Sequence, residues 1–232
     1  GESKRVDYID AGGHEYEQQK DGSFVCSKCG WRQVEMKDLN VSLSYDKCTY
    51  TGKGKTPSTT AVNPLTGETL KKVNPYRDYY SKYENNVEVG TASVTLTAMK
   101  YGVYVNMKEW RGNYKGTVTL NYTVHPDVPK NAYVGYKGSE AKLIWDAAEA
   151  ADKYVVQQYV SGAGWKTIIT TDKTSYSVKN LKDGTSYRFR IGTVGTGKDK
   201  KGNNVPFNSL KYTLVETVKA SDLMVTYSVN DG

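Results

Sequence analysis

The fold of this chain is decided by three stretches near its end, Ala141-Lys-Leu-Ile-Trp145, Ala151-Asp-Lys-Tyr154-Val-Val156 and Tyr176-Ser-Val178-Lys-Asn-Leu181-Lys-Asp-Gly184-Thr-Ser-Tyr187-Arg-Phe189-Arg190. In each stretch, the largest apolar or aromatic residues stand two positions apart. This period of two places alternate side chains on opposite faces of a β-strand. We therefore expect one inward-facing row per strand, made of Leu143 and Trp145, of Tyr154 and Val156, and of Tyr187, Phe189 and Ile191.

In this order, the landmarks resemble those of a fibronectin type III module, in its bacterial variety, across residues 131–220. Trp145 stands where the core tryptophan of such a module is expected. Tyr187 follows a Leu-x-x-Gly-Thr turn, where a tyrosine corner is expected. The resemblance implies a β-sandwich, which by itself implies no activity. The long polar stretch from Gly195 to Asn204 departs from the compact hairpin of the usual module.

Composition favours strands throughout the chain. Its 232 residues include 20 Tyr and three Phe, and hydrophobic residues make up 38%. Tyr and Thr suit a pleated, half-exposed surface. The length allows one large domain or two ordinary ones. We predict an all-β chain of two tandem β-sandwiches, preceded by a short irregular segment.

The first sandwich is predicted over residues 38–125. Alternation is strict in Leu39–Tyr45, Ala92–Ala98 and Val118–Val124, as in antiparallel strands that bury one face and expose the other. The pieces Thr49-Tyr50-Thr-Gly52-Lys53, Asp78-Tyr79, Tyr83-Glu-Asn85-Asn86, Val89-Gly90-Thr-Ala92 and Gly112-Asn113-Tyr114-Lys-Gly116-Thr-Val118 resemble an immunoglobulin-like repeat of exported proteins from Gram-positive anaerobes. That resemblance implies an exported context and no active site. Residues 99–111 interrupt it as an insertion.

The remaining residues are assigned as connections. His125-Pro-Asp-Val-Pro129-Lys130 contains two prolines, which favour extended backbone, so 126–130 is predicted to be a linker between sandwiches. Residues 131–220 form the second sandwich. Residues 221–232 are a tail or the start of a further module. The N-terminus, which lacks Met and an apolar signal core, is interpreted as cut from a longer precursor.

The polar segment 1–37 carries the sequence Cys26-Ser-Lys-Cys29-Gly30, a knuckle of the kind found in zinc ribbons. His14 is a candidate third ligand, but a structural zinc site needs four. The alternatives are a disulfide between Cys26 and Cys29 or two free thiols. We expect no cofactor, with zinc at the knuckle as the one candidate. Cys48 is expected to be a buried, unpaired thiol, and His125 a surface residue without a special role.

Two patterns resemble catalytic motifs and are rejected. Gly192-Thr-Val-Gly-Thr-Gly197-Lys198 has the spacing of a phosphate-binding loop, but Asp199 follows where Ser or Thr is needed, and no helix can follow to direct amides at phosphate. The carboxylates of Asp78, Glu84 and Glu88 have no fixed separation across a cleft. We expect no catalytic residue and no enzyme.

Exposed aromatic residues are the candidate ligand-binding groups, because sugar rings stack on aromatic faces and binding surfaces are rich in Trp and Tyr. The candidates are Tyr101, Tyr104 and Trp110 of the insertion, together with Trp31. The alternative is that these rings cap a core or pack between domains. Trp145 is predicted to lie in the core and Trp165 to be half-buried on a strand.

Charge and hydropathy limit the partners. The net charge is +7, with basic and acidic residues interspersed and one dense basic block at Lys198–Lys201. This argues against nucleic acid, whose binders gather basic residues on one face, and no apolar run is long enough to span a membrane. We predict a monomeric, non-catalytic spacer or adhesion segment of a secreted or cell-wall-attached bacterial protein. Its ligand would be an extracellular glycan, a matrix component or a cell-wall polymer. The alternative is an accessory region of an extracellular hydrolase.

Overall fold

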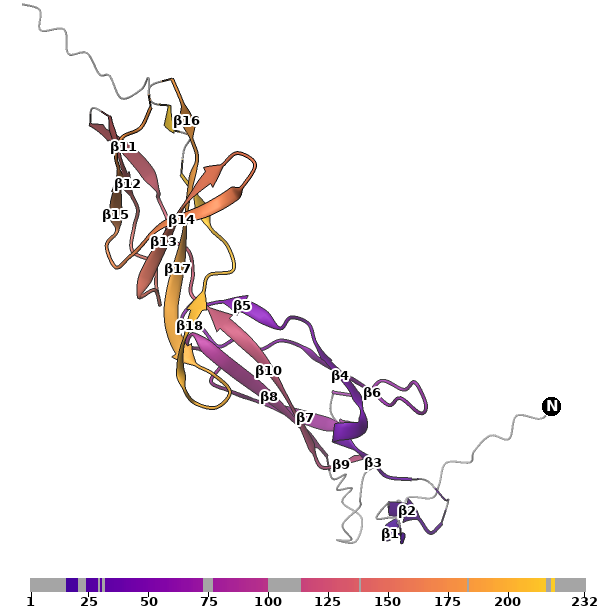
Figure 1. The fold of residues 1–232 in the computed structure, drawn as a ribbon. Coiled ribbons are helices and arrows are strands. Elements are labelled where there is room, and N and C mark those ends of the chain that lie inside the picture. The colour runs from indigo at the N-terminus through magenta and orange to yellow at the C-terminus, as the bar shows by residue number, and fades with distance from the viewer. Residues whose placement is uncertain are drawn as a thin grey trace, which may run out of the picture. The chain divides into compact units, whose positions relative to one another are not determined.

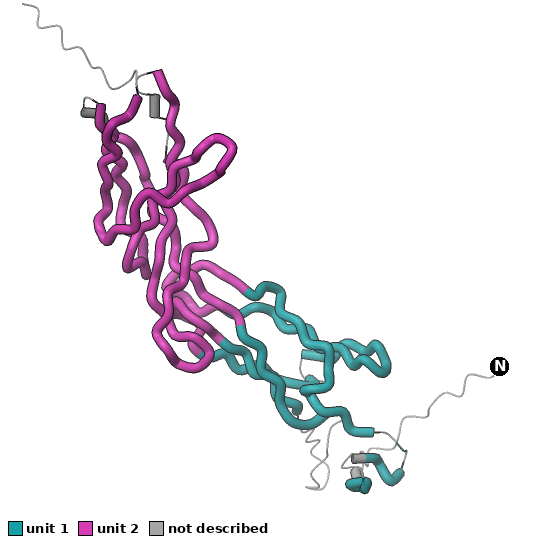
Figure 2. Tube along the Cα trace, in the orientation of Figure 1, with its two compact units in different colours: residues 1–46, 56–84, 93–121 teal, residues 47–55, 85–92, 122–232 magenta. Residues whose placement is uncertain are grey.

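The computed structural model describes residues 16–20, 24–28, 30, 32–72, 77–99, 114–137, 139–182, 184–215 and 218–219 (Figure 1). The chain divides into two compact units (Figure 2). Unit 1 comprises residues 1–46, 56–84 and 93–121, and unit 2 comprises residues 47–55, 85–92 and 122–232. The predicted linker, 126–130, therefore falls inside unit 2.

Unit 1 is built of short strands around one 3-10 turn, η1 (Met36–Asp38). Its strands are β1 (Tyr16–Gln18), β2 (Phe24–Cys26), β3 (Val34–Glu35), β4 (Asn40–Leu43), β6 (Thr59–Val62), β7 (Tyr79–Glu84) and β9 (Tyr114–Lys115). Two longer strands, β8 (Gly90–Ala98) and β10 (Thr117–His125), contribute residues to both units. β4 pairs antiparallel with β6, and β7 with β8, whereas β3 pairs parallel with β9.

The core of unit 1 confirms the predicted alternation. Along β8, Val94 and Leu96 of this unit are fully buried, and so is Ala92 before them, while the residues between them are only partly buried. The buried cluster consists of Met36, Leu39, Ala61, Leu70, Tyr79, Val94, Leu96 and Tyr114. The segment predicted to be irregular contributes Met36 to this cluster, and its described residues also form the β1–β2 hairpin.

Unit 2 contains a sandwich of two sheets. The first sheet has the order β11 (Tyr133–Lys137), β12 (Glu140–Ile144) and β15 (Ser175–Val178). The second sheet has β14 (Gly164–Thr171), β13 (Lys153–Val160) and β17 (Phe189–Lys198) side by side, with β18 (Asn204–Asn208) and β19 (Thr213–Leu214) also paired to β17. A short pair joins β16 (Ser186–Tyr187) to β20 (Val218–Lys219). β5 (Lys47–Thr49) pairs parallel with the end of β10, an exception to the antiparallel pairing expected from the sequence.

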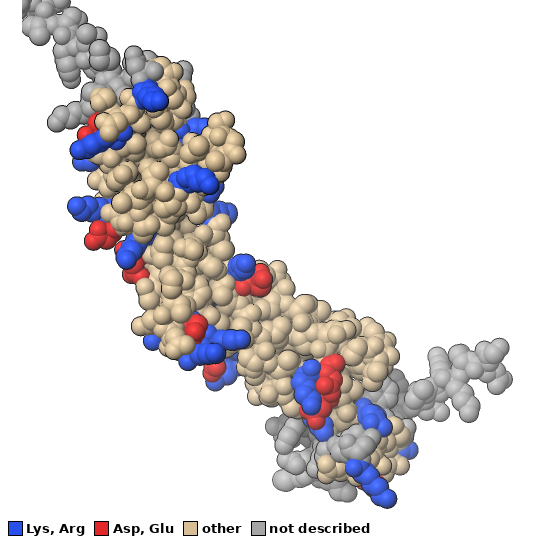
Figure 3. Space-filling view, in the orientation of Figure 1, with Lys and Arg blue, Asp and Glu red and all other residues tan. Residues whose placement is uncertain are grey.

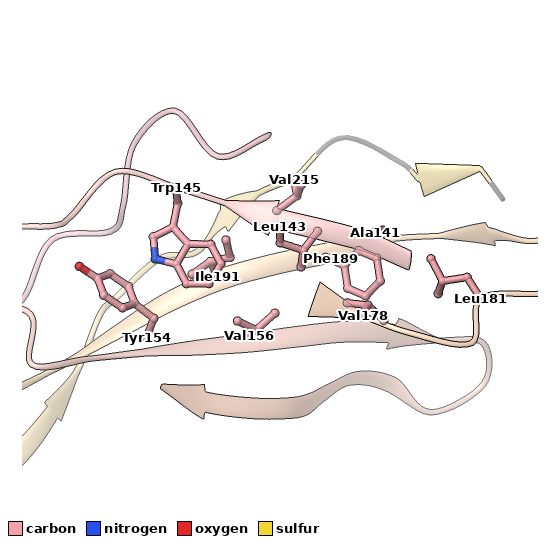
Figure 4. Packing of buried hydrophobic residues seen from close by; sticks show 10 residues of the cluster. All are labelled: Ala141, Leu143, Trp145, Tyr154, Val156, Val178, Leu181, Phe189, Ile191 and Val215. Carbon is pink, nitrogen blue, oxygen red and sulfur yellow. The ribbon is translucent and has the colours of Figure 1, made fainter. Parts of the chain in front are cut away.

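The core of this sandwich lies between the two sheets, where side chains of β12, β13, β15 and β17 meet (Figure 4). The inward rows predicted from Leu143 to Ile191 are confirmed at six of seven positions, since only Tyr187 is half-buried. Trp145 packs edge-on against Tyr154, with ring centroids 5.5 Å apart. Its indole nitrogen is the one buried side-chain polar atom without a hydrogen-bond partner in the described part of the chain.

Tyr187 forms the predicted tyrosine corner. Its hydroxyl accepts a hydrogen bond from the backbone N–H of Lys182, five residues upstream, at 2.9 Å. Its ring stacks on Phe189 of the core, with centroids 6.4 Å apart and planes inclined by 10°. The corner therefore ties the turn before β16 to the sandwich interior.

The long polar stretch is a hairpin of β17 and β18, registered from Val194 opposite Asn208 to Lys198 opposite Asn204. The glycines of the sequence that resembles a phosphate-binding loop thus lie in β17. This agrees with the rejection of that motif. Asp199 holds the turn: its carboxylate accepts hydrogen bonds from the backbone N–H groups of Lys201 and Asn203 at 2.8 and 2.9 Å. These bonds, with one from the Asn203 side chain as the largest cause, lower the pKa of Asp199. The basic block at Lys198–Lys201 surrounds this tip, as predicted.

Residues 126–130 run along β17 and β19 within unit 2. The hydroxyl of Thr193 donates to the carbonyl of Asp127 at 2.6 Å, and that of Thr213 donates to the carbonyl of Pro129. The N–H of Asp146 donates to the carbonyl of Lys130 at 3.0 Å. Residues 126–130 are therefore hydrogen-bonded to the sandwich.

Candidate binding surface

The sequence-predicted site residues fall almost entirely outside the described residues. His14, Cys29 and Trp31 of the N-terminal segment do so, as do Tyr101, Tyr104 and Trp110 of the insertion. Their roles stay predictions.

Cys26 is the described member of the knuckle. Its side chain is buried, and its carbonyl accepts a hydrogen bond from the N–H of Gly30 at 2.8 Å. Gly30 has a φ of +71°, a conformation that glycine adopts at no steric cost. Within the described residues, no group of three or more His, Cys, Asp and Glu side chains is placed to hold a metal ion.

Cys48 is only partly buried, a correction to the expected buried thiol, because it lies on the edge strand β5. Its Sγ lies 3.6 Å from the carbonyl oxygen of Thr123. Burial raises the pKa of this thiol, and Lys55 partly opposes the rise.

His125 has more partners than a surface residue without a role would need. Its Nδ1 lies 2.7 Å from the carbonyl oxygen of Asn208, and its Nε2 lies 2.8 Å from the hydroxyl of Thr123. Because a carbonyl only accepts, Nδ1 carries the proton. The ring also meets Phe207 edge-on, with centroids 5.8 Å apart. His125 therefore fastens the end of β10 to β18 inside unit 2.

The best-formed candidate surface lies on the outer face of the sheet that contains β13, β14 and β17. We call it the Arg–aromatic face and define it by Tyr159, Trp165, Arg188, Arg190 and Tyr212. Period two turns Phe189 and Ile191 of β17 inward, and it turns Arg190 and Arg188, the residue just before β17, outward. The register between β13 and β14 shifts between Val156 and Gln157, because Ile168 of β14 is an extra residue without a partner on β13. This bulge in β14 places Tyr159 directly opposite Trp165.

The two guanidinium groups stack on the rings of this face. The Arg190 guanidinium carbon lies 4.5 Å from the ring centroid of Trp165 and 4.0 Å from that of Tyr212. The Arg188 guanidinium carbon lies 5.1 Å from the ring centroid of Tyr159 and 5.7 Å from that of Trp165. All four distances fall within the roughly 6 Å range of a cation–π attraction. The rings of Tyr159 and Trp165 also meet edge-on, with centroids 5.5 Å apart.

Polar and small residues fix the geometry of the face. The Nε–H of Arg190 donates to the Oε1 of Gln157 at 2.8 Å, and the amide nitrogen of Gln157 donates to the hydroxyl of Thr167 at 3.1 Å. A β-carbon on Gly192 would lie 2.7 Å from the ring of Tyr212. Gly192 therefore lets that ring lie flat on β17, where it meets Arg190.

The composition of the face is that of an interaction surface rather than a catalytic site. Trp, Tyr and Arg are the residue types most enriched at protein interfaces and among the residues that dominate binding energy. Tyr159 keeps 40% of its surface exposed and Leu214, which pairs with Arg190, keeps 64%. The face carries neither a nucleophile next to a base nor a pair of carboxylates.

The sequence could have revealed half of this face. Arg188 and Arg190 alternate with core residues, so the period predicts that they point outward. Trp165 was predicted to be half-buried, which the structure confirms. The bulge in β14 and the return of Tyr212 after the long hairpin have no signal in the sequence, and they bring the rings to the arginines.

The comparisons with known proteins agree with this fold. No family model matches the chain. A fibronectin type III domain-containing protein 3a from Gallus gallus is 24% identical over 171 residues, which cover 68% of this chain and 14% of that protein. The chain thus spans about a seventh of the length of this relative.

Solved structures of the same fold are also similar. An Fn3-like protein from Clostridium thermocellum is 28% identical, with a TM-score of 0.28, over 39% of this chain and 88% of its own. A segment of two fibronectin type III domains from chicken tenascin is 16% identical, with a TM-score of 0.38, over 75% of this chain and 97% of its own. The chain is all-β with a fibronectin type III-like sandwich, a fold whose members are generally non-catalytic adhesion or spacer modules.

Proposed function

We propose that the chain is a non-catalytic spacer and adhesion segment of an exported bacterial surface protein and binds its partner through the Arg–aromatic face. The observation that carries the binding proposal is the stack of Arg188 and Arg190 on three aromatic rings at the surface of unit 2. Two positive charges two residues apart repel each other, a cost that a purely structural surface has no need to retain.

The spacer role is supported by the secondary structure and the charge distribution of the chain. Its described part consists of strands and turns with one 3-10 turn, and no described helix is long and apolar enough to cross a membrane. Lys, Arg, Asp and Glu are scattered over the viewed face rather than gathered (Figure 3). The predicted organisation, an immunoglobulin-like sandwich at 38–125, a linker at 126–130 and a fibronectin type III-like sandwich at 131–220, is part of this proposal.

A panel of immobilised matrix proteins, cell-wall polymers and glycans tests the proposal. We expect at least one ligand to bind the intact chain. Tyr159→Ser should weaken that binding by tenfold or more, because it removes one ring of the Arg–aromatic face. The matched control is Tyr133→Ser, which removes a tyrosine that is 52% exposed on β11, in the opposite sheet. Equal loss in the two variants, or no ligand in the panel, would count against the proposed function.

A further inference from the structure

The guanidinium groups of the Arg–aromatic face are oriented by the chain but not neutralised by it. Arg190 uses its Nε–H on Gln157, and neither arginine forms an ion pair with a carboxylate in the described part of the chain. The positions that share the outer face in the register of β13 and β17 include Val155, Gln157, Gly192 and Val194, and none is acidic. The aromatic rings of the face thus hold the planar guanidinium groups in place and leave N–H groups that can donate to oxyanions. Arginine binds such anions in a bidentate manner.

The surroundings of the two arginines favour a protein partner over a sugar. A sugar ring needs an open aromatic face, whereas here a guanidinium lies over the rings of Trp165, Tyr159 and Tyr212. An exposed aliphatic side chain borders the face, because Leu214, opposite Arg190, is 64% exposed. Aliphatic side chains gain free energy by burial against apolar groups, which protein segments supply.

The spacing of the charges also matches an extended peptide. Arg190 lies on β17, and Arg188 lies immediately before its first residue, Phe189. The carbonyl of Arg188 accepts a hydrogen bond from the N–H of Tyr159 at 2.9 Å, which continues the pairing with β13. The backbone positions of the two arginines are therefore about 6.7 Å apart along the extended chain. Alternate side chains of any extended chain lying along β17 repeat at that same distance.

Resting on the proposed function, we infer that the Arg–aromatic face binds an extended acidic segment of a protein. Carboxylates two residues apart in that segment pair with Arg188 and Arg190, and its apolar side chains cover Leu214. The arginines are held in place before binding, which reduces the conformational entropy that the complex loses.

The test is an NMR titration of the full chain, labelled with ¹⁵N, with a 12-residue peptide in which Glu alternates with Thr. We expect shifts of the Nε–H signals of Arg188 and Arg190 and of the indole N–H signal of Trp165. The same peptide with Gln in place of Glu should bind at least tenfold more weakly. Shifts elsewhere without shifts at these three groups would overturn the inference, as would an absence of shifts at millimolar peptide.

Matched variants separate a formed site from general attraction to a basic protein. Arg188→Gln/Arg190→Gln removes two positive charges from the face, and Lys200→Gln/Lys201→Gln removes two from the exposed hairpin tip. We expect the first pair to weaken binding at least tenfold and the second to stay within twofold. Arg188→Lys/Arg190→Lys keeps the charge but loses the planar stacking, and should lose most of the affinity as well. Equal losses in the first two pairs would overturn the inference.

Other ligands of the Arg–aromatic face would give distinguishable results. Polygalacturonate that binds through these arginines while the Glu peptide does not would overturn the peptide inference and leave the proposed function standing. Self-association in sedimentation that vanishes in Arg188→Gln/Arg190→Gln would overturn it in favour of a second copy of this chain. Thermal melts of every variant check folding, and Arg188→Gln alone, at an exposed position, replaces any double variant that does not fold.

Discussion

The carbonyl oxygen of Val89 lies 2.2 Å from the point that a β-carbon on Gly197 would occupy. Two positions earlier on the same side of β17, a β-carbon on Gly195 would lie 2.3 Å from the carbonyl oxygen of Ala150. Both distances are too short for any real contact. The glycine spacing that resembles a phosphate-binding loop is thus explained within unit 2, because each missing side chain allows a neighbouring backbone to approach.

Gly197→Ala should therefore destabilise unit 2. The added methyl group must displace backbone rather than a flexible side chain, and overpacking of this kind costs about 1–3 kcal/mol. We expect a lower midpoint in urea denaturation followed by tryptophan fluorescence. The control is Gly135→Ala on β11, where the nearest atom to a new β-carbon would be the Lys142 carbonyl oxygen at 3.9 Å. A Gly197→Ala midpoint equal to that of the control would contradict this close approach.

Tyr187→Phe should remove the hydrogen bond from the Lys182 N–H while leaving the stack on Phe189 in place. One such bond contributes about 0.5–1.5 kcal/mol to stability. Urea denaturation should show a loss of that size. Tyr133→Phe, at an exposed tyrosine, is the control and should change nothing. No loss in Tyr187→Phe would mean that the corner does not stabilise the sandwich.

Alkaline pH should destabilise unit 1 through its buried tyrosines. Burial is the largest cause that raises the pKa of Tyr79 and of Tyr114, with the hydrogen bonds to Thr59 and Asn63 as lesser, opposing causes. A phenol with a raised pKa in the folded state contributes stability below its unfolded pKa of about 10 and loses it as the pH rises through the folded value.

The measurement is the urea midpoint of the intact chain and of Tyr79→Phe between pH 8 and pH 11. The intact chain should lose more stability over this range than the variant, because the variant has one buried phenol fewer to ionise. Parallel curves for the two proteins would show that Tyr79 ionises as readily in the folded chain as in the unfolded one.

Period two was sufficient to predict the strands and six of the seven inward positions from Leu143 to Ile191, and the resemblance to fibronectin type III modules predicted the tyrosine corner. Period two was insufficient for features that depend on contacts between distant residues. One such feature is the parallel pairing of β5 with β10, in which Thr123, Val124 and His125 lie beside Lys47, Cys48 and Thr49. Likewise, the carbonyl that accepts a hydrogen bond from His125 belongs to Asn208 of β18, 83 residues later. The Arg–aromatic face needs both a bulge and a returning strand, so alternation alone predicts only the outward direction of its arginines.

The most direct test of the account is hydroxyl-radical footprinting of the intact chain with and without the first ligand found in the binding panel. The account predicts that oxidation of Tyr159, Trp165 and Tyr212 falls when the ligand is bound, while oxidation of Tyr133 stays the same. Protection of Tyr133 or of the hairpin tip at 199–203, with the three rings of the Arg–aromatic face still oxidised at the unbound rate, would contradict it.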